Sequence, residues 1–240
     1  MTEQANTSEL KVLTSNSSFP VLDALAAAYA RAAHRHYGVQ ADTARKILAR
    51  IKDGETADVA VLAATDIEEL AQLGILAHGS LRPFALSRVG VAVRSGAPHP
   101  DVSSVEAFKQ SLRAAKSIAH TVNGASGRYV PLLLERLGLA QEMRSKTVTR
   151  EGGYIGRVVA AGEAEIAIQQ IVELLAVPGI ELVGPLPDEI QKVFPTAAGI
   201  FTASKQPQAA EALLQFLLAP AATPVFREKG LEAVTVQDRA

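Results

Sequence analysis

The chain has no cysteine and no tryptophan, and only 5% of its 240 residues are aromatic. Without cysteine it can form neither disulfides nor thiolate nucleophiles, nor metal sites with sulfur ligands. A cysteine-free chain is compatible with an oxidising compartment but does not require one. Any chemistry of this protein must therefore come from hydroxyl, amide, carboxylate, imidazole or cationic groups.

The chain also lacks an excess of either charge. Its 24 Lys and Arg residues and 25 Asp and Glu residues give a formal net charge of −1. No basic stripe with interleaved aromatic residues occurs, so we expect no nucleic-acid partner. No apolar run approaches the length of a membrane span, so we expect a chain that does not span a membrane.

The N-terminal segment, MTEQANTSEL, is polar and leads directly into a predicted strand. It has neither the charged region nor the apolar region of a secretory signal. Two interpretations follow: the protein is cytoplasmic, or it is periplasmic and its signal peptide has been removed.

Hydrophobic residues make up 48% of the chain and charged residues 20%, which is typical of a globular protein with a sizeable core. Short apolar strands alternate with amphipathic helices along the sequence. The pattern predicts strands at 11–14, 58–62 and 117–122, and helices at 20–34, 43–52, 104–115, 207–218 and 220–229. Such alternation favours a parallel sheet covered by helices.

Two segments have the character of crossings between lobes. Residues 89–93 form a β-rich run followed by the turn-rich stretch 95–100, and residues 196–202 form a strand of small residues. We therefore predict an α/β protein of two Rossmann-like lobes with the second inserted in the first. Lobe 1 takes residues 1–88 plus 200–240 and lobe 2 takes residues 89–199. A ligand cleft is expected between them.

The stretch GASGRYV, residues 124–130, follows a predicted strand and precedes a helical pattern that ends at Gly138. A strand, a turn of small residues and a helix present free backbone N–H groups and the positive end of the helix dipole to an anion. Arg128 adds a full positive charge. The alternative is an ordinary helix start with Ser126 as the N-cap.

Three further turns have the same strand-to-helix character. They lie at residues 14–18, rich in hydroxyls, at 41–43, before a helix that carries Arg45 and Lys46, and at 150–154, which contains two glycines. Each turn alone is explained by helix capping. Four such turns at the carboxyl ends of strands, two from each lobe, fit an anion site better. Arg128 or Arg45 would add charge-assisted hydrogen bonds.

Several stretches together carry a family resemblance. They are residues 57–62, 117–139 with Gly127-Arg128-Tyr129, 162–165 running into 168–170, 178–187 and 226–231. In their order and spacing the chain resembles type II periplasmic solute-binding proteins, in the branch similar to the molybdate-binding proteins of ABC transporters. The resemblance covers roughly residues 10–233. It implies two lobes, two crossover segments and a ligand held in the cleft between the lobes.

The resemblance also implies which residues hold the ligand. In molybdate binders, hydroxyls and backbone amides at helix starts hold a tetrahedral oxyanion. Here those positions correspond to one of Ser15, Ser17 and Ser18 in the first turn, Thr43 in the second, Ala125, Ser126 and Gly127 with Arg128 in the third, and Gly152 or Gly153 in the fourth.

Some residues depart from the molybdate-binding pattern. A tyrosine that contacts the oxyanion falls at or beside Gln170, and Asn16 stands in an altered first turn. The Gly-Gly-Tyr154 turn and the Gln169-Gln170 pair resemble a divergent subgroup that includes aconitate isomerase-like members. Glutamine amides both donate and accept hydrogen bonds. We therefore expect a small organic di- or tricarboxylate rather than molybdate, with Asn16, Tyr154 and Gln170 among the ligand-binding residues.

Two functions follow from this resemblance. The first is reversible anion binding by a monomeric solute-binding protein, with an ABC-transporter membrane component as a partner and without cofactor or metal. The second is an isomerase of aconitate type, which must move a proton next to a carboxylate and so needs a general base. A protein-interaction role would instead predict a cleft filled by apolar side chains.

For an isomerase, the sequence offers His120 and Glu151 as bases, Tyr154 as a proton donor and Arg128 to stabilise developing negative charge. Each also has a simpler interpretation. His120 fits a strand-end histidine bonded to the backbone, Glu151 fits a favourable charge at a helix N-terminus, and Tyr154 fits a wall of the cleft.

Overall fold

Three parallel strands of lobe 1 end at a common edge, and each leads into a helix. The strands are β1 (Leu10–Ser15), β2 (Tyr37–Asp42) and β3 (Val59–Ala63), followed by α1 (Phe19–Ala33), α2 (Ala44–Lys52) and α3 (Ala64–Gln72). Strand β1 pairs with both of its neighbours. The computed structural model describes residues 9–234, so the prediction for the polar N-terminal segment lies mostly outside the described residues.

Lobe 2 repeats this arrangement. Its elements are α4 (Val105–Ala114), β5 (Ile118–Thr121), α5 (Ala125–Arg136), α6 (Ala140–Met143), β6 (Thr147–Arg150), α7 (Gly156–Ala160), β7 (Ile166–Gln170), α8 (Ile171–Leu175) and β8 (Ile180–Pro185). Strand β5 pairs in parallel with β6 and β7. The strands of the two lobes end at edges that face each other.

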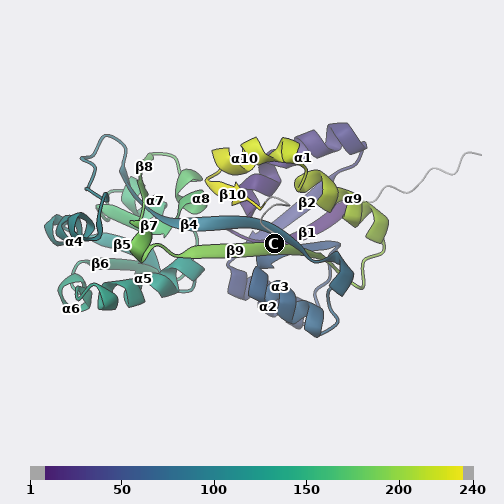
Figure 1. The fold of residues 1–240 in the computed structure, drawn as a ribbon, viewed down its shortest axis with the longest axis horizontal. Helices are drawn as coiled ribbons and strands as arrows, with labels where there is room; N and C mark the ends of the chain where they lie inside the picture. The colour runs from purple at the N-terminus through teal and green to yellow at the C-terminus, as the bar shows by residue number, and fades with distance from the viewer. Residues whose placement is uncertain (1–8, 235–240) are drawn as a thin grey trace, which may run out of the picture.

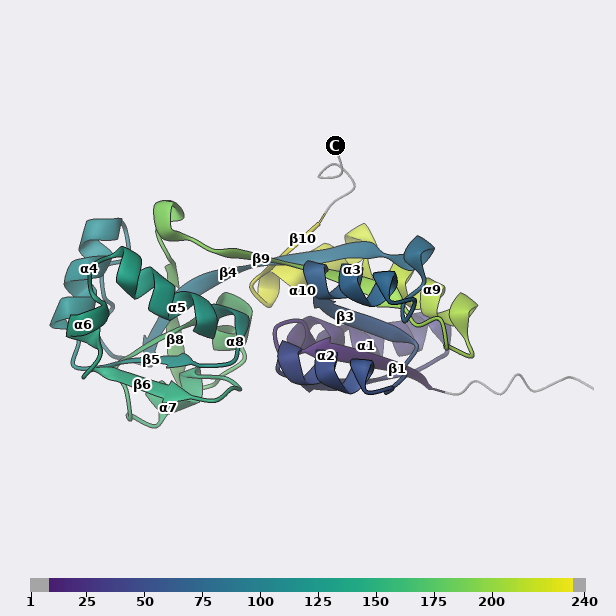
Figure 2. The same ribbon diagram turned by 90° about the horizontal axis from the view of Figure 1, so that it is seen from below.

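Two long antiparallel strands, β4 (Arg82–Arg94) and β9 (Val193–Ile200), join the lobes (Figure 1). The strand order is β2-β1-β3-β9-β4-β7-β5-β6, with β8 and β10 (Leu231–Ala233) paired to β4. Figure 2 shows this ribbon of two strands running along one side of both lobes. The remaining elements are η1 (His78–Ser80), η2 (Asp188–Ile190), α9 (Pro207–Leu217), η3 (Pro220–Ala222) and α10 (Thr223–Glu228).

The pairing partners of β4 and β9 indicate where lobe 1 ends and lobe 2 begins. The first half of β4 pairs with β9 and β10, whereas its second half pairs with β7 and β8. Residues 196–200 of β9 pair with β3 of lobe 1. Both predicted boundaries, at 88/89 and 199/200, thus fall within strands. We propose that lobe 1 passes into lobe 2 within β4, and that the chain returns near the start of β9.

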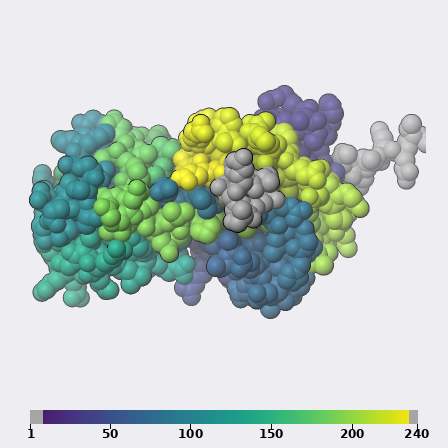
Figure 3. Space-filling model, viewed as in Figure 1, coloured from purple at the N-terminus to yellow at the C-terminus, as the bar shows by residue number. Residues whose placement is uncertain are grey.

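Each lobe has hydrophobic clusters on the two faces of its part of the sheet. In lobe 1, one cluster gathers β1, α1, α9 and α10, and another gathers β3, α2 and α3. In lobe 2, one cluster lies under α4 and α5 and another under α7. In the space-filling view the lobes form two masses, with the C-terminal helices over lobe 1 (Figure 3).

No single helix among residues 9–234 is long and apolar enough to cross a membrane. Helices α9 and α10 meet that test only as a pair, and they are bent by 55° at the break between them. Leu213, Leu214 and Leu217 of α9 are buried in the core of lobe 1. The apolar character of α9 is thus explained by packing.

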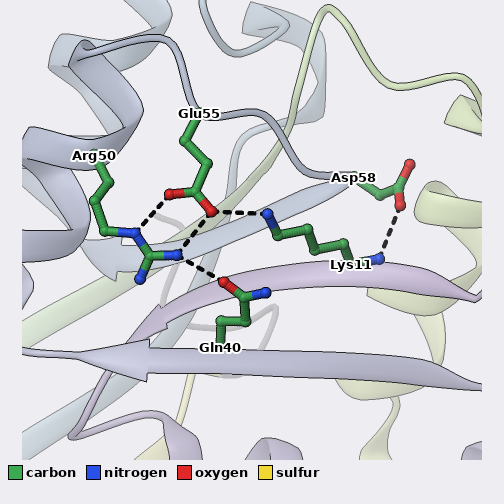
Figure 4. Close-up of polar contacts among 5 residues, drawn as sticks. All are labelled: Lys11, Gln40, Arg50, Glu55 and Asp58. Atoms are coloured by element: carbon green, nitrogen blue, oxygen red, sulfur yellow. Dashed lines mark hydrogen bonds and ion pairs between the residues drawn. The ribbon is translucent and has the colours of Figure 1, made fainter.

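A polar network lies beside the amino-terminal end of β1 in lobe 1 (Figure 4). Glu55 bridges Lys11 and Arg50, and Arg50 also donates to Gln40. The Lys11 amide donates to Asp58 over 2.8 Å. Hydrogen bonds from Arg50 and then Lys11 lower the pKa of Glu55 to about 2. This network lies at the opposite end of β1 from Ser15, so it supports the sheet without entering the cleft.

Candidate functional site

A cavity of about 320 Å³ lies between the lobes at the carboxyl ends of the strands. Most of the predicted ligand-binding residues line it: Ser15, Asn16, Ser17, Thr43, Ala125, Arg128, Gly152, Gly153 and Gln170. They come from five strand-to-helix turns that are far apart in the sequence. The parallel strands explain their meeting, because the carboxyl ends of such strands share one edge of the sheet.

In lobe 1 the cavity wall is made by the starts of α1, α2 and α3. The hydroxyls of Ser15 and Ser17 lie 3.0 Å apart, and Thr43 is the N-cap residue of α2. The first amides of a helix have no partner within the helix, and the helix dipole makes that end positive. Thr65, in the first turn of α3, also lines the cavity, although the sequence analysis did not single out this turn.

In lobe 2 the GASGRYV stretch forms the start of α5. The N-cap is Gly124, so Ser126 as the N-cap is wrong: Ser126 lies inside the first turn, because the helix begins at Ala125. A β-carbon added to Gly127 would lie 2.1 Å from the carbonyl oxygen of Thr121. Only glycine lets the helix pack this closely on the end of β5.

Four of the predicted ligand-binding residues do not line this cavity: Ser18, Ser126, Gly127 and Tyr154. The Ser18 and Ser126 hydroxyls are buried behind the wall without a hydrogen-bond partner among the described residues. Thr121, which the sequence analysis missed, does line the cavity, and its buried hydroxyl is also unpaired. This hydroxyl lies against the start of α5, 2.9 Å from the β-carbon position of Gly124.

The three predicted acid–base residues lie outside the cavity lining. The Nδ1 atom of buried His120 is 2.8 Å from the carbonyl oxygen of Thr121. Glu151 accepts a hydrogen bond from Asn123 and lines an outer cavity together with Arg45 and Lys46. The structure brings neither base to the main cavity.

Tyr154 crosses from lobe 2 to lobe 1. Its hydroxyl donates to the carbonyl oxygen of Asn16 over 3.4 Å, and the Arg157 guanidinium lies 5.6 Å from the centre of its ring. Burial, the largest cause, raises the pKa of Tyr154 to about 12. The tyrosine therefore keeps its proton at neutral pH.

The two glutamines at the end of β7 have different partners. Gln169 donates to the carbonyl oxygen of Gly153 and accepts from the amide of Ile155, each over 2.8 Å. It thereby fixes the Gly-Gly-Tyr turn. The amide of Gln170 instead lies 3.4 Å from a carboxyl oxygen of Glu173.

Glu173 is a cavity residue that the sequence analysis missed. It stands in the first turn of α8 and is only 7% exposed. Burial raises the pKa of its carboxyl to about 8, and hydrogen bonds from Gln170 and Gln169 oppose that shift only in part. No ion pair to Glu173 occurs among the described residues. At neutral pH the carboxyl is therefore mostly protonated.

Two cations, Arg128 and Lys192, line the same cavity. Neither forms an ion pair within 4.0 Å among residues 9–234. Arg128 acts at longer range on Asp66 in α3, where it opposes the rise in pKa that burial causes. The cavity thus presents positive charge, amides and hydroxyls to a ligand.

The lobes touch at the mouth of the cavity. A β-carbon added to Gly152 would lie 2.7 Å from Cγ2 of Thr43. Together with the contact between Tyr154 and Asn16, this approach shows that the described conformation is closed.

Residues 10–232 match the family model for bacterial extracellular solute-binding proteins. The chain belongs to this family. Its fold is that of the type II periplasmic binding proteins. The molybdate-binding protein of Azotobacter vinelandii superposes with a TM-score of 0.79 at 18% identity, over 95% of this chain and all of that one. The sulfate-binding protein of Mycobacterium tuberculosis superposes with a TM-score of 0.73 at 15% identity, over 96% and 88%.

A curated relative of this solute-binding protein is an aconitate isomerase from a Pseudomonas species. It is 36% identical over 234 residues, which make up 95% of this chain and 89% of the relative. Among the described residues, no group of three or more His, Asp or Glu side chains is placed to hold a metal ion.

Proposed function

We propose that this solute-binding protein is an isomerase that interconverts the cis and trans forms of aconitate, or of a closely similar tricarboxylate, in its interlobe cavity. The observation that carries the proposal is a buried, protonatable carboxyl, Glu173, in the wall of a cavity otherwise suited to anions. A carboxylate repels an anionic ligand and is costly to bury. Pure binding gains nothing from it, whereas proton transfer needs such a group. The 36% identity to an aconitate isomerase supports the same conclusion.

The reaction needs only a proton to move. A base takes a proton from the methylene carbon next to a carboxylate, and the electron pair spreads over the adjacent double bond and carboxylate. A proton then adds to the carbon at the other end of this system, and the double bond re-forms between the neighbouring pair of carbons. Atoms and charge balance without a redox partner.

The cavity suits the charge that develops in this step. Arg128, Lys192 and the amides at the start of α5 stabilise negative charge on the carboxylates, as positioned donors do in other enzymes. The volume of about 320 Å³ is at the small end of ligand sites, which span about 300–1,000 Å³. This size favours a small acid.

The second candidate function is binding of such an acid without turnover, as a solute-binding component that passes its ligand to a membrane transporter. Membership of an extracellular solute-binding family and the closed two-lobed fold favour it. For either function we propose a periplasmic location.

The test is to incubate the protein with cis-aconitate and, separately, with trans-aconitate, and to follow the appearance of the other isomer by chromatography. Calorimetric titrations with both isomers, molybdate, tungstate and sulfate accompany it. Interconversion supports the isomerase. Saturable aconitate binding without turnover supports the second function. Tight molybdate or tungstate binding with no response to di- or tricarboxylates refutes both organic-acid proposals.

A further inference from the structure

We infer that Glu173 is the acid–base group of this cleft: it contacts the bound polycarboxylate and moves a proton off one carbon and onto another. Gln170 positions its carboxyl. This inference rests on the proposed function and adds to it the residue that performs the chemistry.

Elimination within the cavity is the first argument. Among the residues that line it, Glu173 is the one carboxylic acid, and no histidine or tyrosine is present. Apart from Arg128, the remaining titratable group of the lining is Lys192. It is exposed and carries a positive charge, unlike a carboxylate base. The three acid–base residues predicted from the sequence all lie outside this lining. A proton acceptor next to a ligand bound here is therefore Glu173.

The surroundings of the carboxyl are the second argument. Among the described residues its polar partners are the amides of Gln170 and Gln169, and no cation there contributes to its shift in pKa. The charge of Glu173 contributes to the raised pKa of Tyr154. The charged side chains that share the cavity with Glu173 are Arg128 and Lys192. A pKa of about 8 leaves both protonation states accessible near neutral pH. Such a group can take a proton in one step and return it in the next.

The anchoring of α8 is the third argument. Val172, next to Glu173, is buried in the lobe 1 cluster that contains Phe226 and Leu231. A β-carbon added to Gly90 of β4 would lie 2.6 Å from Ile171, so α8 lies directly on the crossing strand. In both ribbon views α8 is on the side of lobe 2 that faces lobe 1 (Figures 1 and 2). Contacts with both lobes fix the carboxyl, as a reacting group requires.

The test uses the full chain with Glu173→Gln, which keeps the size of the side chain but cannot carry the proton. Glu173→Asp keeps the carboxyl on a shorter stem. Glu135→Gln, an exposed position near the far end of α5, is the matched control. We expect Glu173→Gln to bind trans-aconitate but to lose interconversion by roughly 100-fold or more. Glu173→Asp should regain part of the rate and Glu135→Gln should match the wild type.

The pH dependence separates a chemical role from a structural one. The kcat/KM of the wild type should rise with pH up to about 8, because the base must lose its proton. Its affinity for tricarballylate, a saturated tricarboxylate that cannot isomerise, should fall about tenfold between about pH 7 and pH 9, one unit above this pKa, because an ionised Glu173 repels the anion. In Glu173→Gln the affinity should show no such fall.

Each outcome has one meaning. Near-normal turnover by Glu173→Gln overturns the inference and leaves the isomerase function standing. Wild-type protein that does not interconvert aconitate, but shows a Glu173-dependent fall in tricarballylate affinity, refutes the isomerase and the transfer to carbon, while the contact of Glu173 with the ligand stands. If the wild type neither interconverts aconitate nor shows the fall in tricarballylate affinity, both the isomerase function and the role of Glu173 are overturned.

Discussion

Gly152 offers a direct test of whether ligand binding closes the lobes. Its β-carbon position lies 2.7 Å from Thr43 Cγ2, across the mouth of the cavity, and ordinary contacts at such positions are 3.4–4 Å. The backbone of Gly152 is not in the left-handed region that disfavours other residues. Gly152→Ala therefore changes only the space at this contact, and the lobes must separate by about 0.7 Å or more to admit the methyl group.

The size of the effect follows from the cost of overpacking, about 1–3 kcal/mol per inserted group. The contact exists only when the lobes are closed, so the cost falls on the closed, ligand-bound state. The dissociation constant for trans-aconitate should therefore rise ~5- to 150-fold. Thermal stability of the ligand-free protein should stay close to that of the wild type. Isothermal titration calorimetry and thermal unfolding measure the two quantities.

Thr43→Ser provides the control, because it removes Cγ2 while keeping the hydroxyl and the helix cap. The double variant Gly152→Ala/Thr43→Ser should recover most of the lost affinity. Gly153→Ala is a contrasting case: no atom of the described part of the chain lies within 4 Å of its β-carbon position, but its φ of +82° disfavours alanine. Its defect should not respond to Thr43→Ser. Unchanged affinity in Gly152→Ala, or no recovery in the double variant, would refute closure at this contact.

Three further changes test the site. The pKa of Glu173 is about 8 in the folded protein against an ordinary value of 4.5, so the unfolded chain releases this proton first as pH rises. Between pH 5 and pH 8 the wild type should lose stability relative to Glu173→Gln by about 3–4 kcal/mol; urea unfolding at the two pH values measures this loss, and equal stability changes in the two proteins would contradict the buried carboxyl. Arg128→Ala should weaken trans-aconitate binding ~10- to 100-fold and make it less sensitive to salt, with unchanged thermal stability, since Arg128 has no close ion pair within residues 9–234; titration at two salt concentrations tests this. Gln169→Ala should destabilise the protein by about 1–3 kcal/mol in urea unfolding, because it leaves the Ile155 amide and the Gly153 carbonyl without their partner; an unchanged midpoint would argue against this role.

The sequence was sufficient for much of the fold and for four of the turns at the cavity. Glycine and hydroxyl residues between an apolar strand and a helical pattern are a local signal, and α5 and β5 show it clearly. The fold class followed from the alternation of these elements. The interpretation with Ser126 as the N-cap of α5 was wrong. Hydroxyl residues are common at N-caps, but Gly124 occupies the N-cap position of this helix.

Other residues of the site gave no local signal. Helix α8 has five residues, too few for a helical period to be recognised, so Glu173 had no predicted element around it. Lys192 reaches the cavity only because β9 crosses from one lobe to the other. His120 and Thr121 are neighbours in sequence, but the alternation of side chains along a strand turns them to opposite faces. These features depend on tertiary packing.

The ribbon of β4 and β9 determines how far each part of the cleft can travel. When one body rotates against another, atoms near the axis move little and distant atoms move furthest. Residues 192–196, which include the start of β9, line the cavity, and α8 lies on β4 at Gly90, so this part of the cavity is close to the axis. Gly152 and Thr43 meet across the mouth of the cavity, and we expect them to undergo the largest displacement. If the lobes open about this ribbon, we expect a ligand to enter through a wide opening while Glu173 hardly changes position, so that each release would leave the carboxyl already in place.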